Sequence, residues 1–271
     1  MRWPWSGWTE KEKPKVEERR IPVSWTDSLN AIDWDHYKEP RNWVPTLLVT
    51  STVVFSLHIY RSYMRRIPGT SYVRPDYYRK RSLFGRVTSV GDGDNFHLYH
   101  TPGGRITGWG WLRRVPTKKT KLKNKTIPIR IAGIDAPEGA HFGRPSQPYS
   151  AEALAWLTSY INGRRVRAKI YRRDQYDRIV ATVFTRKWFI KRDVGLEMLK
   201  RGLATTYEAK TGAEFGGLEA KYKAAEAFAK ERKLGMWSGK PADFESPRDY
   251  KNRMIAEDAA KESQPPVPPV V

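Results

Sequence analysis

Three acidic residues and two arginines, in three separate segments, have the side chains needed to cleave a phosphodiester bond. The segments are Asp-Gly-Asp at 92–94, Arg-Ile-Ala-Gly-Ile-Asp-Ala-Pro-Glu at 130–138 and Asp-Gln-Tyr-Asp-Arg at 174–178. Phosphodiester cleavage needs a hard cation, an activated water and positive groups where charge builds up on the phosphoryl oxygens. These residue types therefore predict a metal-assisted phosphodiesterase.

Each residue suits one part of that reaction. Asp94 and Asp135 offer the carboxylate oxygens that a calcium-like ion prefers. Glu138 can orient or deprotonate the attacking water. Arg130 and Arg178 stay charged and can grip a phosphate through two parallel hydrogen bonds. Either acidic segment alone is also an ordinary turn sequence, so the order and spacing of all three segments carry the interpretation.

From about Phe84 to Ser238 the chain resembles the staphylococcal nuclease family, the thermonucleases, and the likeness includes the closing Leu-Gly-Met-Trp-Ser. The resemblance implies cleavage of DNA and RNA that leaves 3′-phosphates. It implies these site residues: Asp94, Asp135 and the backbone carbonyl of Ala136 as Ca²⁺ ligands, Glu138 as general base or water-positioning group, and Arg130 and Arg178 as the phosphate clamp. The family usually has Thr in place of Ala136, and a backbone ligand tolerates that change.

Two tyrosine positions bear on substrate contacts. Tyr176 matches a family tyrosine that contacts a nucleotide phosphate. The family's loop usually reads Tyr-Gly-Arg, whereas this one has Asp177 before Arg178. Asp can adopt left-handed backbone geometry at modest cost, so we expect the loop to survive and the added acid to weaken the hold of Arg178 on phosphate. A second tyrosine pair of the family is matched only by Tyr207, which leaves base contacts open.

The residues of the site need a scaffold, and the sequence predicts an α+β fold that is mainly a β barrel with helices. Short strands rich in Val, Ile and aromatic residues are predicted over 84–90, 96–99, 127–134, 166–171 and 179–184. Helices are predicted over 150–161, 193–201 and 217–233, and Leu218, Tyr222, Ala225 and Phe228 form one apolar stripe. Five strands with three helices agree with the five-stranded OB-fold barrel of the resembled family.

The formal net charge of +21 and the pI near 10.1 indicate an anionic partner. Residues 82–238 hold thirty basic against fourteen acidic groups, so the charge is concentrated in the predicted nuclease domain. Eight of the basic residues lie in a long connection, 101–126, together with Trp109 and Trp111; it is either a nucleic-acid-tracking loop or a solvated insertion. There is no cysteine, which excludes a disulfide scaffold and a thiol nucleophile.

Residues 42–60 are nineteen uncharged residues, enough for a helix of roughly 28 Å, close to the thickness of a bilayer core. Trp43 and Tyr60 stand at its ends as interfacial anchors would. We predict a single transmembrane helix; a buried helix or a strand over 49–57 is the alternative. Seven basic residues in 61–81 follow, which predicts a nuclease domain on the cytoplasmic or matrix side. Resemblance to fungal single-pass membrane endonucleases implies a mitochondrial location.

The remaining segments are predicted to be a flexible Trp-rich arm over 1–41, a basic juxtamembrane linker over 61–81, and a Pro-rich flexible tail over 239–271. Taken together, the sequence predicts a membrane-anchored, Ca²⁺-dependent endonuclease with little sequence specificity for DNA or RNA. One alternative is a catalytically weak or inactive nucleic-acid-binding module tethered to a membrane, because domains of this family often lose their acids. Another is a membrane tether whose tails recruit protein partners.

Overall fold

The computed structural model describes residues 38–140, 144–187, 189–207, 213–240 and 244–262. The chain divides between His58 and Ile59 into two units, which are considered separately. The described part of the first unit consists almost entirely of α2, Pro40–Ile59, which has no buried residue. With the π-helical turn Tyr60–Met64 it forms a helix of 25 residues that is long and apolar enough to cross a membrane. A helix therefore forms where the sequence predicts one.

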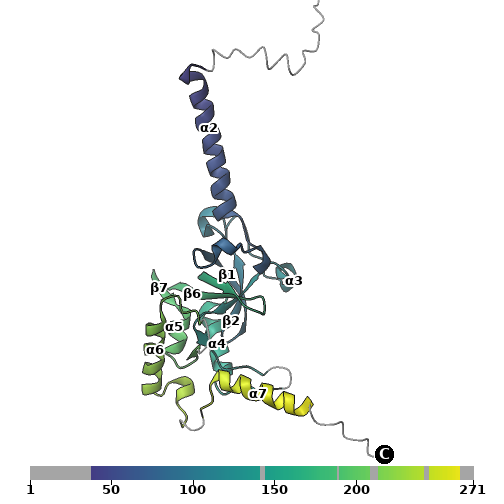
Figure 1. Ribbon diagram of the computed structural model, residues 1–271, viewed down its shortest axis with the longest axis vertical. Coiled ribbons are helices and arrows are strands. Elements are labelled where there is room, and N and C mark those ends of the chain that lie inside the picture. The colour runs from purple at the N-terminus through teal and green to yellow at the C-terminus, as the bar shows by residue number, and fades with distance from the viewer. Residues whose placement is uncertain (1–37, 141–143, 188, 208–212, 241–243, 263–271) are drawn as a thin grey trace, which may run out of the picture. The chain divides into compact units, whose positions relative to one another are not determined.

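A closed five-stranded barrel is the centre of the second unit (Figure 1). Its strands are β1 (Ser82–Asp92), β2 (Asn95–His100), β3 (Ile127–Ile131), β5 (Arg165–Arg173) and β6 (Ile179–Lys187). They are hydrogen-bonded in the order β3-β2-β1-β5-β6, and a parallel pairing of β3 with β6 closes the ring. The other pairs are antiparallel, including that of β1 with β5, which are not consecutive in the chain, and β7 (Ile190–Asp193) extends β6 outside the ring.

Alternating burial along the strands fills the barrel and points polar residues outward. In β3 the side chains of Ile127, Ile129 and Ile131 are fully buried, whereas Pro128 and Arg130 between them are not. This period of two is the pattern of a strand with one face on a core. The larger of two clusters of buried residues includes side chains from all five barrel strands and from the helices around them. Arg130 therefore lies on the face of β3 opposite to the barrel core.

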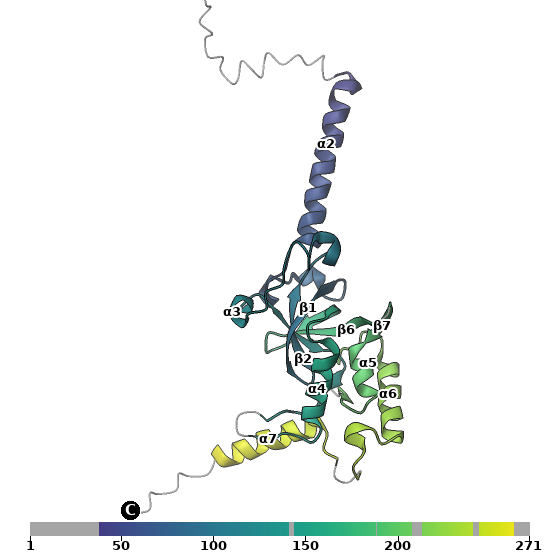
Figure 2. The same cartoon turned by 180° about the vertical axis from the view of Figure 1, so that it is seen from behind.

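Three helices surround the barrel, and Figures 1 and 2 show α5 and α6 side by side next to β7. They are α4 (Ser150–Ile161), α5 (Val194–Leu199) and α6 (Glu219–Glu231). Asp193 caps α5 by accepting a hydrogen bond from the Leu196 N–H. The buried Tyr222 hydroxyl of α6 donates to both oxygens of Asp193, 2.9 and 3.0 Å away. One carboxylate thus joins α5 to α6, and the predicted α+β fold is confirmed.

The region predicted as one strand over 127–134 is divided in two. β3 ends at Ile131, and β4 (Ile134–Asp135) pairs with β8 (Thr205–Thr206) in a separate two-stranded sheet. Gly133 causes the break, because its φ of 75° is left-handed and a side chain there would collide with Phe215 and Tyr222. In the predicted apolar stripe of α6, Tyr222 and Ala225 are buried, but Phe228 is 41% exposed.

The segment 61–81 is part of the folded domain rather than a free linker. Ile67, Val73 and Tyr77 belong to the buried core, and short 3-10 turns form at Thr70–Tyr72 and Pro75–Tyr77. Arg81 lies over the ring of Tyr77, 4.2 Å from its centroid. The apolar residues between the arginines explain the difference, because they can be buried while the guanidinium groups remain at the surface on aromatic faces.

Parts of the other connecting segments are also ordered. Residues 101–126 contain a 3-10 turn, Gly104–Thr107, and a short helix α3, Lys119–Leu122, with Trp109 buried and Trp111 exposed. A further 3-10 turn, Gly235–Trp237, follows α6, and α7 (Pro247–Glu262) forms within the predicted flexible tail. The Trp-rich arm up to residue 37 and the proline-rich end from 263 lie outside the described residues.

His100 makes the stability of this domain depend on pH. Its Nδ1 accepts a hydrogen bond from the Ile67 N–H, 2.9 Å away, and burial, with Arg66 nearby, lowers its pKa from 6.5 to about 4. Between these two values the unfolded chain binds a proton that the folded chain does not, so stability falls as the pH falls. One pKa unit corresponds to about 1.4 kcal/mol, so we expect protonation of His100 to lower the free energy of unfolding by about 3 kcal/mol in total.

Urea unfolding of the detergent-solubilised chain at pH 7 and pH 4.5 measures this effect. His100→Gln keeps an acceptor for the Ile67 N–H but cannot bind the proton, so its free energy of unfolding should fall less over this range than that of the unmodified chain. An equal fall in both proteins would show that His100 is not the source.

Candidate active site

A cleft of about 960 Å³ on the barrel contains every side chain that the sequence predicts for catalysis, cation binding or phosphate contact. These residues are Asp94, Arg130, Asp135, Glu138, Tyr176 and Arg178. Ala136, whose backbone carbonyl is the remaining predicted ligand, is buried directly after Asp135. The three segments, separated in sequence, thus meet on one side of the domain.

The turn between β1 and β2 places Asp94 beside Arg130. Asn95 is the strand partner of Arg130 in the β2–β3 pairing, and the Ile131 N–H donates to the Asp94 carbonyl, 2.9 Å away. The turn lies close to the chain that follows β4, since a Cβ on Gly93 would come within 2.7 Å of the Ala136 Cβ. Glycine at 93 therefore allows the turn and the Asp135–Ala136 segment to pack together.

Short pairings fix Asp135 and Glu138 at the base of the cleft. Asp135 is the strand partner of Thr205, whose hydroxyl donates to the Asp135 carbonyl, 3.3 Å away. The Glu138 N–H donates to the side-chain oxygen of the buried Gln147, and the Gln147 N–H donates back to the Glu138 carbonyl, each at 2.9 Å. The reciprocal bonds hold the backbone of Glu138 in one position.

Arg178 is held by Asp174, at the other end of the β5–β6 loop. Asp174 Oδ1 accepts from the backbone N–H groups of Tyr176 and Arg178, and its Oδ2 accepts from Arg178 Nε, 2.8 Å away. Among the described residues, none is paired with the two terminal nitrogens of Arg178. Its guanidinium carbon is 5.1 Å from the ring centroid of the exposed Tyr176. The Arg178 guanidinium is thus positioned through Nε, and its two terminal nitrogens can bind an anion.

Asp177, which replaces the usual glycine, has the left-handed backbone that the loop requires, with φ of 62°. Its carboxylate is paired with Arg173 on the exposed side of the loop. The acid adjacent in sequence to Arg178 therefore binds a different arginine, and the side chain that binds Arg178 is Asp174.

Burial controls the charges at the centre of the cleft. Asp94 and Asp135 are almost fully buried, and the Arg130 fork reaches both, with distances of 3.1 Å to Asp94 and 2.9 Å to Asp135. Burial raises the pKa of Asp94 to about 6, although Arg130 lowers it, and the neighbouring Asp135 raises it further. Burial alone would lower the Arg130 pKa, but the two carboxylates outweigh it and hold that pKa above its usual value. Arg130 therefore neutralises only part of the buried negative charge.

The donor set fits a hard divalent cation that is only partly held by side chains. Two buried carboxylates sharing a guanidinium form an oxygen-rich, electron-rich centre of the kind calcium prefers. In the described part of the chain, no group of three or more His, Cys, Asp or Glu side chains is arranged to hold a metal ion. A cation bound to Asp94 and Asp135 would therefore take further oxygens from a backbone carbonyl and from water.

Three residues in or next to the cleft have no role in the sequence-based prediction: Asp174 and Lys251 line it, and Gln147 is hydrogen-bonded to Glu138. Asp174 could have been noticed as an acid four residues before Arg178, a spacing suited to a side-chain-capped loop. Gln147 carries no such signal, because its partner Glu138 is reached only through the fold. Lys251 comes from α7, within the predicted tail; its Nζ is 2.7 Å from Glu138 Oε1 and 3.0 Å from Asp135 Oδ1.

A barrel that gathers three acids and two arginines in one basic cleft defines a nuclease, an enzyme that hydrolyses phosphodiester bonds in nucleic acids. A family model described as "Staphylococcal nuclease homologue" matches residues 128–239. The chain belongs to the staphylococcal nuclease family.

Similar proteins come from fungi and carry the name "Probable endonuclease LCL3" or its lower-case form. The protein from Pyricularia oryzae is 64% identical over 261 residues, covering 96% of this chain and 99% of its own length. The protein from Sclerotinia sclerotiorum is 63% identical and covers 92% and 94%; the one from Botryotinia fuckeliana is 61% identical and covers 91% and 96%. The likeness to each of these relatives extends over more than nine tenths of the chain.

Arg130 is expected to stabilise the fold as well as the site. In Arg130→Met the buried carboxylate of Asp94 loses the guanidinium 3.1 Å away, and breaking a buried pair costs about 3–5 kcal/mol. We expect the free energy of unfolding, measured with urea in the presence of a chelator, to fall by about 3 kcal/mol.

The matched control is Arg173→Met, which breaks the exposed pair with Asp177 and should cost less than about 1 kcal/mol. Similar losses in the two variants would contradict a central role for the Arg130 ion pairs.

Proposed function

We propose that this chain is a membrane-anchored, calcium-dependent endonuclease that hydrolyses DNA, RNA or both with little sequence specificity. The observation that carries the proposal is the meeting of Asp94, Arg130, Asp135, Glu138 and Arg178 in one cleft. The proposal is supported by the family match and by the names of the fungal relatives. It goes further than both in specifying the metal and the membrane.

The residues of the cleft divide the work of phosphodiester hydrolysis. Calcium bound by Asp94, Asp135 and the Ala136 carbonyl would supply positive charge to the scissile phosphate. Glu138, on a backbone clamped by Gln147, takes the proton of the attacking water. Arg178 binds the phosphoryl oxygens through its two terminal nitrogens, and Arg130 adds charge beside them as negative charge develops in the transition state.

Backbone recognition would give the nuclease its broad substrate range. Arg144, Arg172, Arg173 and Arg248 line the same cleft and can contact phosphates, which carry no sequence information. Tyr176 is the proposed phosphate-contacting tyrosine, and Tyr207 lies below Arg130, with its ring centroid 5.3 Å from the guanidinium carbon. The exposed Trp111 in the basic segment 101–126 offers a surface on which a base can stack.

We further propose that α2 crosses a membrane once, since none of its residues is buried and its length suits a bilayer core. The arginines that follow α2 favour the cytoplasmic or matrix side for the nuclease unit. A mitochondrial membrane is proposed from the resemblance to fungal endonucleases of this type. Partner proteins are not required by any part of the proposal.

Plasmid cleavage by the full chain in detergent tests the enzymatic proposal. We expect nicking that needs calcium and stops with chelator, and a fall in rate of about 10²–10⁴-fold in Glu138→Gln, because that change removes a general base. Glu152→Gln, an exposed carboxylate on α4, serves as the control and should cleave normally.

Tight DNA binding without cleavage at any calcium concentration would overturn the proposal that the chain is an enzyme. It would instead favour the alternative, a nucleic-acid-binding module tethered to a membrane.

Alkaline carbonate extraction of membranes that carry the full chain tests the anchor. We expect the protein in the membrane pellet, and release of Val53→Arg/Val54→Arg, because each arginine at the centre of a span costs about 2.5–3.5 kcal/mol. The double variant Val53→Leu/Val54→Leu keeps the helix apolar and should remain in the pellet. Complete release of the unmodified chain would refute a membrane-spanning α2.

A further inference from the structure

The C-terminal helix α7 forms one wall of the catalytic cleft. Arg248, Lys251, Asn252 and Ile255 all line it. Lys251 contacts two of the predicted site residues, with its half-buried ammonium 2.7 Å from Glu138 and 3.0 and 3.3 Å from the two oxygens of Asp135. One flexible cationic side chain therefore binds a proposed cation ligand and the proposed general base together.

Several separate contacts fix α7 in this position. Tyr250 and Met254 are buried, and the Tyr250 hydroxyl donates to the Pro145 carbonyl. Further along the helix, Arg144 is paired with Asp258. Both partners, Pro145 and Arg144, belong to the connection between Glu138 and α4. The helix is thus attached to the segment that carries the proposed general base.

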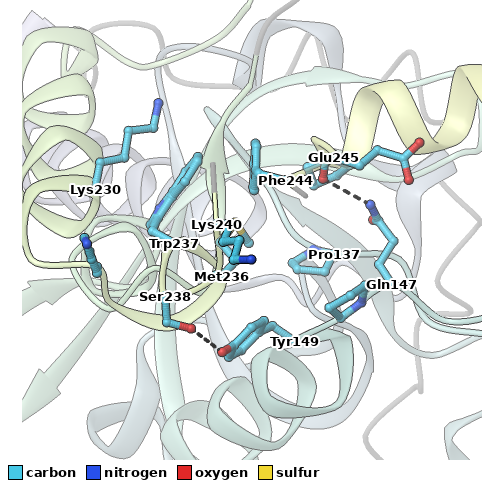
Figure 3. Close-up of a pocket in the computed structure, with 14 residues that line it drawn as sticks. Pro137, Gln147, Tyr149, Lys230, Met236, Trp237, Ser238, Lys240, Phe244 and Glu245 are labelled. Carbon is cyan, nitrogen blue, oxygen red and sulfur yellow. Dashed lines mark hydrogen bonds between the residues drawn. The ribbon is translucent and has the colours of Figure 1, made fainter. Parts of the chain in front are cut away.

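The chain that leads into α7 is attached to the same segment (Figure 3). The side-chain amide of Gln147 donates to the Glu245 carbonyl at 3.5 Å, and the rings of Trp237 and Phe244 lie 4.2 Å apart. The Tyr149 and Ser238 hydroxyls are hydrogen-bonded at 2.5 Å across an apolar cavity of about 650 Å³. Gln147 therefore contacts both Glu138 and the residue Glu245, shortly before α7. These contacts, together with those of α7 itself, fix the position of Lys251 next to Glu138.

The charges of the ion-paired cluster around Arg130 and Lys251 favour exchange of Lys251 for a divalent cation. Within this cluster, Asp94, Asp135 and Glu138 carry three negative charges when ionised, against the two positive charges of Arg130 and Lys251. Substituting a divalent ion for the ammonium would bring the sum to zero. The ammonium and the ion require the same carboxylate oxygens of Asp135, so the two cannot bind them fully at the same time.

We propose that Lys251 is an internal cation of the active site that competes with calcium for Asp135 and holds Glu138 until calcium displaces it. The proposal rests on the proposed calcium-dependent nuclease function. While Lys251 binds Glu138, the carboxylate is occupied by an ammonium; when Lys251 withdraws, Glu138 can accept a proton from water. Lys251 is in this sense a positioning residue that links the C-terminal helix to the loading of the site.

Calcium binding without any nucleic acid tests the competition. In isothermal titration calorimetry on the full chain in detergent, Lys251→Met should bind calcium at least about tenfold more tightly, because a competing positive charge is lost within 4 Å of the site. Lys251→Arg keeps the charge, so its calcium affinity should stay within about threefold of that of the unmodified chain; a small difference is expected because Arg and Lys differ in geometry. Lys223→Met, which removes an exposed lysine from α6, is the matched control and should bind calcium like the unmodified chain.

A second measurement uses the unmodified protein and so does not depend on folding of a variant. Lysines are acetylated with an amine-reactive ester, with and without calcium, and the rate at each lysine is followed by mass spectrometry. Displacement from the two carboxylates should raise the acetylation rate of Lys251 several-fold, while the rate at Lys223 stays constant.

The outcomes separate this proposal from the one on which it rests. Equal calcium affinity in Lys251→Met and the unmodified chain, or a Lys251 acetylation rate that calcium leaves unchanged, would overturn the role of Lys251. Calcium-dependent plasmid cleavage would then still support the nuclease. Absence of both calcium binding and cleavage in all variants would overturn both proposals.

Discussion

The site depends on keeping two buried carboxylates, those of Asp94 and Asp135, close together. Asp94 comes from the β1–β2 turn and Asp135 from β4, and burial together with the nearby Asp135 carboxylate raises the pKa of Asp94. Arg130 makes the arrangement possible by reaching both carboxylates from the outer face of β3. Its position follows from the alternation of β3, which buries isoleucine on either side of it, and from the pairing of β3 with both β2 and β6. Closure of the barrel therefore determines the geometry of the site.

Much of this arrangement could be predicted from the sequence, because the information is local. Helix α4 has the predicted bounds, and the five barrel strands lie where Val, Ile and aromatic residues are concentrated. The structure also brings the six predicted side chains into one cleft. The division of 127–134 was harder to predict, because an isoleucine follows Gly133 and continues the apolar pattern. Only the collision that a Cβ would make with Phe215 and Tyr222 identifies the break.

Contacts between distant segments explain what could not be predicted. The helix α7 has no strong apolar face; it packs through Tyr250 and Met254, and its partners Arg144 and Pro145 lie more than a hundred residues earlier in the chain. Gln147 likewise gains its role only when the Glu138 segment folds back on it. Composition suggested a tail after 239 and a linker over 61–81. In both segments a few apolar side chains are buried although most of their neighbours are charged or polar. Burial of one large apolar side chain stabilises the folded state by about 1.5–3 kcal/mol, which favours an ordered segment.

The β5–β6 loop illustrates how a departure from a family pattern is absorbed by its neighbours. Asp177 lies in the left-handed region, where Asp is one of the few residues other than glycine that is tolerated. Two acids and two arginines then form two separate pairs, Asp177 with Arg173 at the surface and Asp174 with Arg178 in the cleft. Because the surface pair is exposed, it contributes little energy, but it directs the Asp177 carboxylate away from the phosphate-binding fork. The loop therefore accommodates Asp177 in the left-handed conformation, and the acid that is paired with Arg178 is Asp174.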